Sequence, residues 1–214
     1  MTTLLNLLDD LRLRLNDTGD SQVTKTDKIR MLNHGLRAMY PATYRPALDT
    51  TIVLATDTYE YAFSASLEGS RLIDLELQEP TTNRWVRLEE AGYGFRIVRS
   101  GAAAAPKLEL DTAPASTHVG RTVRAIVAMP YTALSADADV VGCADELIEL
   151  PVLYAMGIAT SIPLDDRLDY KRYSTTAGQN AVFPRDIMEV SQFWFAQFQT
   201  LLDEHRMPVP GAGF

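Results

Sequence analysis

Three histidines and one cysteine are the side chains of this 214-residue chain best suited to metal binding or nucleophilic catalysis. His34, His118 and His205 lie far apart, and none has another His or Cys at metal-ligand spacing, so we expect no zinc or iron site. Cys143 has no local nucleophile motif, so we expect a buried or neutral thiol, and as the single cysteine it excludes an intrachain disulfide. The sequence predicts neither a cofactor nor an enzymatic activity.

Four further motifs could each be interpreted as a chemical site, but a purely structural role is favoured for each. Gly92-Tyr93-Gly94 resembles a phosphate-binding loop, but it lacks the lysine and the following helix and indicates a hairpin turn. Asp137-Ala138-Asp139 lacks the spacing of a calcium loop. The pairs Asp9-Asp10 and Asp165-Asp166 would splay by about 100° on a helix. Tyr170–Tyr173 holds two basic residues between tyrosines and favours a solvated helix end over a phosphate contact.

Composition and charge exclude several classes of protein. A hydrophobic share of 46% and a charged share of 22% are ordinary globular values. The net charge of −8 disfavours a general nucleic-acid-binding surface, and it is uneven: residues 1–48 carry +2, residues 49–130 carry −3 and residues 131–214 carry −7. No apolar run approaches the roughly 20 residues of a membrane span, and we expect no signal peptide.

Amphipathic helices are predicted at both ends of the chain. The N-terminal pair covers residues 3–16 and 27–40, the second capped by Thr26 or alternatively Thr24. In the first helix, leucines recur at the 4-3-4 spacing of a helix-packing seam: Leu4, Leu8, Leu11 and Leu15. A third helix starts near residue 144, where Pro151 marks a kink or a second start, and a short one is expected at 165–173.

The last helix, residues 185–205, has the widest apolar surface. Its apolar stripe is Ile187, Val190, Trp194, Phe198 and Leu201, widened by Phe193, Phe195 and Leu202. Such a helix must be covered by helices of its own chain, by a neighbouring subunit, or by both.

Between the helix pairs the period of the apolar residues changes to about two, which predicts about seven short antiparallel strands. Residues 51–54 and 59–63 are expected to form one hairpin, and residues 72–77 and 85–88 a second. The predicted class is α+β: a helical bundle with an inserted small antiparallel β-sandwich or barrel. The predicted divisions are an N-terminal helix pair (1–48), the β domain (49–130), C-terminal helices (131–206) and an extended tail (207–214).

Two segments resemble a known family. Residues 23–36, VTKTDKIRMLNHGL, are similar to the second-helix start of head-to-tail connector proteins of tailed bacteriophages, with a Thr/Asp cap and a mid-helix Asn followed by a small residue. Residues 144–151, ADELIELP, resemble the acidic start of their next helix. The last helix and the Pro/Gly-rich tail also fit. The resemblance covers the helical half of the chain, while the β insert departs from the smallest members, which are helical throughout.

The resemblance implies a virion structural protein of the neck, made in the host cytoplasm. It would form a ring, commonly dodecameric, below the portal protein, dock the next neck or tail protein, and pass DNA without sequence-specific binding. Interface candidates are Trp194, Phe195, Phe198, Leu201, Pro208, Pro210, Phe214, Leu4 and Leu8. Channel-facing candidates are Asp165, Asp166, Lys171 and Arg172.

The alternative is a carbohydrate- or ligand-binding β module on a helical stalk, in another tail or baseplate component. Trp85, Tyr93 and Phe95 would then form an exposed stacking surface on one β face. The competing interpretation is that these three aromatic residues belong to the core of the insert.

Overall fold

The computed structural model describes residues 2–64, 71–98, 107–161 and 184–207, with side chains of the last range described from residue 188. The chain divides into two compact units. The helical unit comprises residues up to Thr43 together with Tyr131–Met207, and the β unit comprises Tyr44–Pro130. The mixed α and β class is confirmed, but both sheets are open, so the closed-barrel alternative is wrong.

The helices of the described residues lie close to where periodicity predicts them. They are α1 (Leu4–Arg14), α2 (Lys25–Met39), α3 (Glu149–Ser161) and α5 (Pro184–Glu204), with a 3-10 turn η2 (Asp145–Leu147) before α3. Thr24, the alternative cap, is the one used: its side chain accepts the Asp27 N–H at 3.1 Å. Pro151 lies in the first turn of α3, where a missing N–H costs nothing, so it marks a second helix start rather than a kink.

Seven strands form two antiparallel sheets in the described residues. They are β1 (Arg45–Val53), β2 (Glu60–Ala62), β3 (Arg71–Gln78), β4 (Trp85–Arg87), β5 (Phe95–Val98), β6 (Lys107–Leu110) and β7 (Thr122–Met129). One sheet has the order β1-β7-β3-β4 and the other β2-β6-β5. The predicted hairpin of β3 and β4 is confirmed, but that of residues 51–54 with 59–63 is wrong, because β1 pairs with β7 and β2 with β6.

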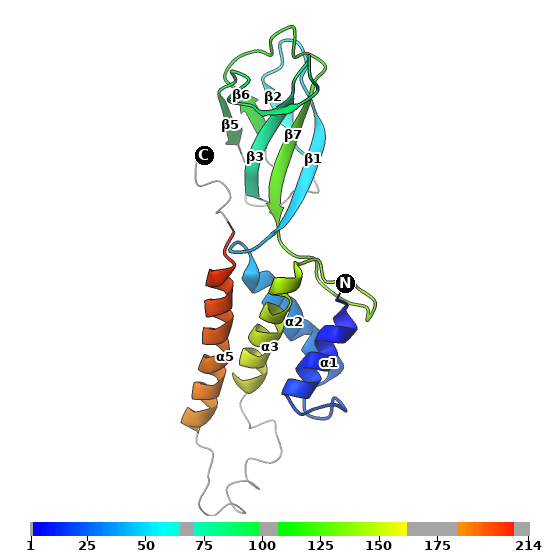
Figure 1. Cartoon of the computed structure of the whole chain (residues 1–214), viewed down its shortest axis with the longest axis vertical. Coiled ribbons are helices and arrows are strands. Elements are labelled where there is room, and N and C mark those ends of the chain that lie inside the picture. The colour runs from blue at the N-terminus through cyan, green and yellow to red at the C-terminus, as the bar shows by residue number, and fades with distance from the viewer. Residues whose placement is uncertain (1, 65–70, 99–106, 162–183, 208–214) are drawn as a thin grey trace, which may run out of the picture. The chain divides into compact units, whose positions relative to one another are not determined.

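The chain enters and leaves the β unit through neighbouring strands. β1 and β7 run side by side and antiparallel, and their register begins at Arg45 opposite Met129 (Figure 1). β1 therefore starts before the predicted boundary at residue 49. A register shift follows Asp49, whose carboxylate accepts the N–H groups of Thr51 and Ser64 at 2.9 and 3.0 Å. Antiparallel pairing returns the chain to the point where it left the helices.

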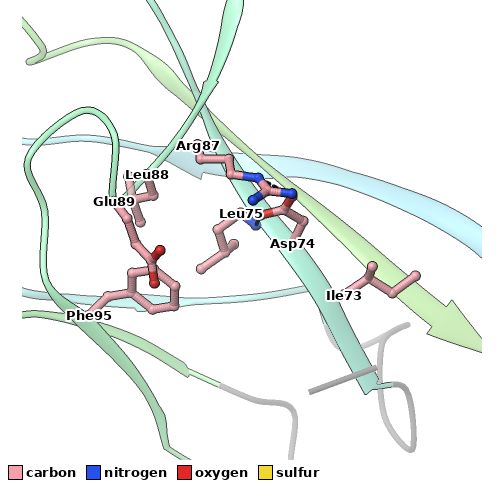
Figure 2. A pocket seen from close by; sticks show the side chains of 7 residues that line it. All are labelled: Ile73, Asp74, Leu75, Arg87, Leu88, Glu89 and Phe95. Atoms are coloured by element: carbon pink, nitrogen blue, oxygen red, sulfur yellow. Dashed lines mark hydrogen bonds and ion pairs between the residues drawn. The ribbon is translucent and has the colours of Figure 1, made fainter. Parts of the chain in front are cut away.

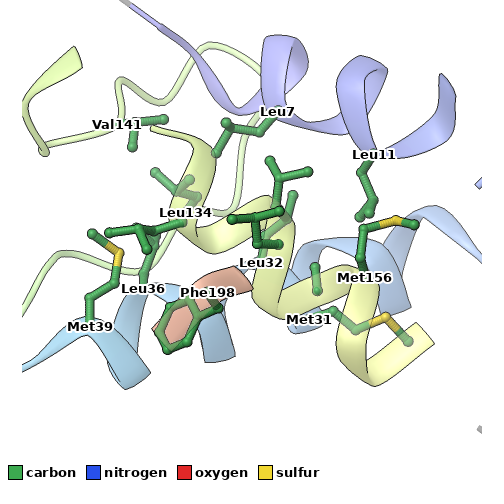
Figure 3. Packing of buried hydrophobic residues seen from close by; sticks show 14 of the residues in the cluster. Leu7, Leu11, Met31, Leu32, Leu36, Met39, Leu134, Val141, Met156 and Phe198 are labelled. Carbon is green, nitrogen blue, oxygen red and sulfur yellow. The ribbon is translucent and has the colours of Figure 1, made fainter. Parts of the chain in front are cut away.

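The helical unit has one hydrophobic core built around α3 (Figure 3). The side chains of α3 are buried on nearly all sides, and α1, α2 and α5 each pack against it. Labelled members in Figure 3 include Leu7 and Leu11 of α1, Leu32 and Leu36 of α2, and Phe198 of α5. A helix that is apolar all round is stable only when it is enclosed in this way.

Two residues of α2 hold segments that follow the β unit in sequence. The Asn33 amide donates to the Leu134 carbonyl and accepts the Leu134 N–H, both at 2.8 Å. At Gly35 the backbones of α2 and α3 approach so closely that an added Cβ would lie 2.7 Å from the Pro151 Cα. The mid-helix Asn and Gly of α2 therefore join the two halves of the helical unit.

A buried ion-pair cluster fixes the loop between α1 and α2. The Lys28 side chain is fully buried, and its Nζ donates to the Asp17 carboxylate at 2.8 Å, the Asp17 carbonyl at 3.0 Å and Asp20 at 2.7 Å. Asp17 also accepts the backbone N–H groups of Ser21, Gln22 and Val23. Arg12 completes the cluster with a two-nitrogen contact to Asp20. Every buried charge in the cluster therefore has a partner.

The cluster lowers the pKa of both aspartates. Burial alone would raise the pKa of Asp17, but the hydrogen bonds from Lys28 and from three backbone N–H groups outweigh it and hold the pKa well below its usual range. Hydrogen bonds from Arg12 and then Lys28 lower the pKa of Asp20 in the same way. Both carboxylates therefore stay ionised in moderately acidic solution.

Gly35→Ala should destabilise the protein by about 1–3 kcal/mol, because the new methyl group must push α3 away from α2. Helix propensity alone predicts the opposite sign, a gain of about 1 kcal/mol. Urea unfolding measures the difference. Gly19→Ala is the matched control, because an added Cβ there has nothing within 4 Å. A Gly35→Ala variant as stable as the native chain would contradict the close helix contact.

Lys28→Met should lower the free energy of unfolding by about 3–5 kcal/mol, because it leaves the buried Asp17 carboxylate without its ammonium partner. Lys25→Met is the control, since the Lys25–Asp137 pair is exposed and should contribute less than about 1 kcal/mol. Denaturant unfolding at neutral pH compares the two variants, and equal losses would refute a special role for the cluster.

The pH dependence of the unfolding free energy gives a second test of the Lys28→Met variant. The folded pKa values of Asp17 and Asp20 lie below the unfolded value of about 4. Their contribution to stability is therefore complete above that value and is lost as the pH falls toward the folded pKa. The native chain should lose stability steeply below about pH 4, and Lys28→Met should lose less over the same interval.

Candidate interaction surface

α5 packs alongside α3 (Figure 1), and specific side-chain contacts hold one side of it there. Phe195 lies over Gly157, where an added Cβ would come within 2.8 Å of the ring. The Ser191 hydroxyl donates to the Gly157 carbonyl at 2.8 Å. Tyr154 makes edge contacts with Phe195 and Phe198, with ring centroids 5.3 and 5.1 Å apart. The inner face of α5 therefore belongs to the core of its own chain.

α5 also exposes large apolar side chains beyond the face that packs on α3. Met188 is 61% exposed, Val190 47% and Phe193 53%, and Phe193 contacts the edge of Trp194. Within the described part of the chain, the hydrophobic surface of α5 is therefore wider than the surface that α3 covers.

A groove of about 300 Å³ runs beside this half of α5. Val190 and Trp194 form one wall, and Met156 and Thr160 of α3 also line it. The other wall comes from the end of α1 and the loop after it, namely Arg14, Leu15, Asp17, Gln22 and Val23. The buried ion-pair cluster thus shapes one side of the groove.

The interface candidates on α1 are core residues. Leu4 and Leu8 are both 0% exposed and pack inside the helical unit. A direct contact with another subunit needs accessible atoms, which these two side chains lack. The exposed leucines of α1 are instead Leu5, at 41%, and Leu13, at 74%. The 4-3-4 seam correctly identifies a packing face, but the partner is this chain's own α2 and α3.

The interface candidates on α5 differ in burial. Phe198 is 5% exposed and lies in the core (Figure 3), whereas Trp194, Phe195 and Leu201 are half-buried beside it. Met188 lies outside the predicted apolar stripe of α5, and an apolar side chain off that stripe was the available signal for an exposed position. The remaining candidates lie outside the described residues: Pro208, Pro210, Phe214, Asp165, Asp166, Lys171 and Arg172, as does the helix expected at 165–173.

The β-unit aromatics do not form one exposed patch. Tyr93 is 4% exposed, and its hydroxyl accepts the Ala115 N–H at 3.0 Å and bonds to His118 Nδ1 at 2.8 Å. Trp85 lies on β4, with the Arg124 guanidinium 4.4 Å from its ring centroid. Phe95 lies on β5, in the other sheet, and packs against the core. The ring face that a sugar would stack on is occupied at Trp85 and buried at Tyr93.

A small pocket of about 220 Å³ lies on the β unit (Figure 2). Arg87 and Asp74 meet across it in an ion pair of 3.1 Å, and Glu89 and Phe95 lie at its rim. Ligand pockets are usually larger, about 300–1,000 Å³, and mostly apolar. Its size and its paired charges make it a weak candidate for a ligand site.

The residues considered for chemistry are dispersed. His34 is exposed on α2, His118 is hydrogen-bonded to the Tyr93 hydroxyl, and His205 lies just beyond α5. Burial raises the pKa of the Cys143 thiol to about 11, so the thiol is neutral and unreactive near pH 7. Among the described residues, no group of three His, Cys, Asp or Glu side chains could hold a metal ion. Nor does any helix of those residues combine the length and hydropathy needed to cross a membrane.

Comparison with known proteins gives no relative: no protein-family model matches the chain, and no curated protein matches it. Among the described helices and strands, α5 exposes the most large apolar side chains.

Phe198→Ala should cost about 3–5 kcal/mol of stability, because it opens a cavity in the core. Phe193→Ala should change the stability of the single chain by no more than about 0.5 kcal/mol, since half of that ring is exposed. Urea unfolding of dilute protein compares this pair of identical substitutions on one helix. A large loss for Phe193→Ala would show that the ring is covered within the chain.

Proposed function

We propose that this protein is a virion structural protein, a head-to-tail adaptor of a tailed bacteriophage that assembles into a ring below the portal protein. The observation that carries the proposal is the exposure of three large apolar side chains on α5, namely Met188, Val190 and Phe193. Subunits of obligate assemblies leave such surfaces to be covered by a neighbour, whereas monomers rarely expose them on a helix.

The division into a helical unit and a β unit also supports an assembly role. We propose that the four helices act as a bundle and that the two sheets, which share one hydrophobic core, act as a sandwich. The bundle would form the body of the ring, and the β unit would serve as a platform for the next neck or tail protein.

The motifs that carry the family resemblance have structural roles in this chain. Asn33 binds the backbone of Leu134, and Gly35 admits the backbone of Pro151. Both contacts join α2 to segments that follow the inserted domain, the loop at Leu134 and the start of α3, and neither performs chemistry. A scaffold or adaptor protein requires motifs of this kind, whose residues stabilise the fold and do not catalyse a reaction.

Charge supports a channel that DNA passes through without being held. Residues 131–214 carry five basic and twelve acidic residues. Like charge weakens binding to phosphates, so a lumen lined by these residues would not retain DNA. The partners proposed are further copies of this chain, the portal protein and a downstream neck or tail protein.

The native mass of the full-length protein, measured alone and with its cognate portal protein, tests the proposal. We expect a closed oligomer, about twelve copies of the 23.7-kDa chain if the family stoichiometry holds, formed alone or on the portal. Electron microscopy should then show annular particles with a central opening. A monomer or dimer that does not bind the portal would refute the proposal, and unrelated ring proteins of similar acidity serve as the control for portal binding.

A further inference from the structure

The outward side of α5 has an acidic residue at each end and the aromatic side chain of Phe193 between them. Glu189, Phe193, Ala196, Thr200 and Asp203 follow one another at 4-3-4-3 spacing, and all five are exposed. We call these residues the α5 outer face. The helix as a whole contains four acidic residues and one basic residue. Glu204, exposed next to Asp203, adds to the negative charge at its C-terminal end.

The outward side of α2 has the opposite charge. Arg30, His34 and Arg37 recur at 4-3 spacing and are all exposed, and we call them the α2 outer face. The Arg30 side chain is 75% exposed, and its one ion pair within the described residues is with Asp27, at 3.8 Å. Arg37 makes no ion pair within the described part of the chain. The helix as a whole contains four basic residues and one acidic residue. This face therefore has positive charge to offer to a partner.

The two outer faces lie on different helices that both pack against α3. Contact between two copies of the α5 outer face would bring acidic side chains together, and contact between two α2 outer faces would bring arginines together. Like charges at close range disfavour both symmetric pairings. Contact between the α5 outer face of one copy and the α2 outer face of another pairs opposite charges. It leaves the α2 outer face of the first copy and the α5 outer face of the second free for further contacts.

We propose that the α5 outer face of one copy binds the α2 outer face of the next copy, and that repetition of this contact builds the ring. The inference rests on the proposed function, since it identifies the surfaces that join its subunits. Phe193, at the centre of one face, packs on the arginine stems and guanidinium groups of the other. Ala196, one turn further along, is small enough to let the two helices approach.

Charge reversal with mixing tests the contact. One variant carries Arg30→Glu with Arg37→Glu, and the second carries Asp203→Lys with Glu204→Lys. Each variant has two faces of like charge, so each should need a protein concentration roughly tenfold higher or more for assembly. An equimolar mixture should assemble as the native chain does, because alternating copies restore opposite charges at every contact. A chain with all four changes should also assemble.

The matched control is Arg45→Glu with Arg84→Glu, which changes the net charge equally on exposed arginines of the β unit. It should leave assembly unchanged. Analytical ultracentrifugation measures assembly, on the portal if the native chain assembles only there. Circular dichroism checks that each variant is folded.

Each outcome separates this inference from the proposed function. If the native chain forms rings that both reversals leave intact, or if the mixture fails to restore assembly, the α5–α2 contact is wrong while the ring stands. If the native chain neither assembles nor binds portal, the proposed function falls and this contact falls with it.

Discussion

The structure depends on the contact between α2 and the segments that follow the β unit. Asn33 and Gly35 precede the insert in sequence, while Leu134 and Pro151 follow it. These contacts form only if the insert returns the chain to its starting point. Pairing of β1 with β7 from Arg45 opposite Met129 achieves this, because neighbouring antiparallel strands bring both ends of the insert together. The entropy of closing a long loop is thereby offset within the β unit itself.

This arrangement determines which surfaces remain exposed. α3 lies at the centre of the helical unit because α1 and α2 reach it from before the insert and α5 from after it. Each outer helix uses one face for the core and leaves the other to solvent. On α2 that outer face carries Arg30 and Arg37, whereas on α5 it includes Phe193. The exposed apolar surface thus follows from the position of α5 at the edge of the unit.

Local signals in the sequence predicted most of the elements but few of their partners. Periodicity placed the helices and strands, because burial on one face leaves a pattern within a single segment. It paired residues 51–54 wrongly with 59–63, because strand pairing across a long sequence separation leaves no local pattern. It assigned Leu4 and Leu8 to a subunit interface, because an apolar seam does not reveal whether its partner is the same chain. The Lys28 cluster was missed for a related reason: a lysine is normally solvated, and only the tertiary fold brings Asp17 and Asp20 to it.

The distribution of charge favours a head-to-tail contact as the mode of the proposed self-association. The basic helix lies before the insert and the acidic helix after it, and both pack on the same central helix. A symmetric dimer formed through only one of these helices would join like faces, which costs free energy at close range. A head-to-tail contact joins unlike faces, and it continues from copy to copy until the rotation closes the ring or a filament forms. The segregation of charge between α2 and α5 therefore argues for an open-ended contact, and closure into a ring then depends on the angle between the two faces within one chain.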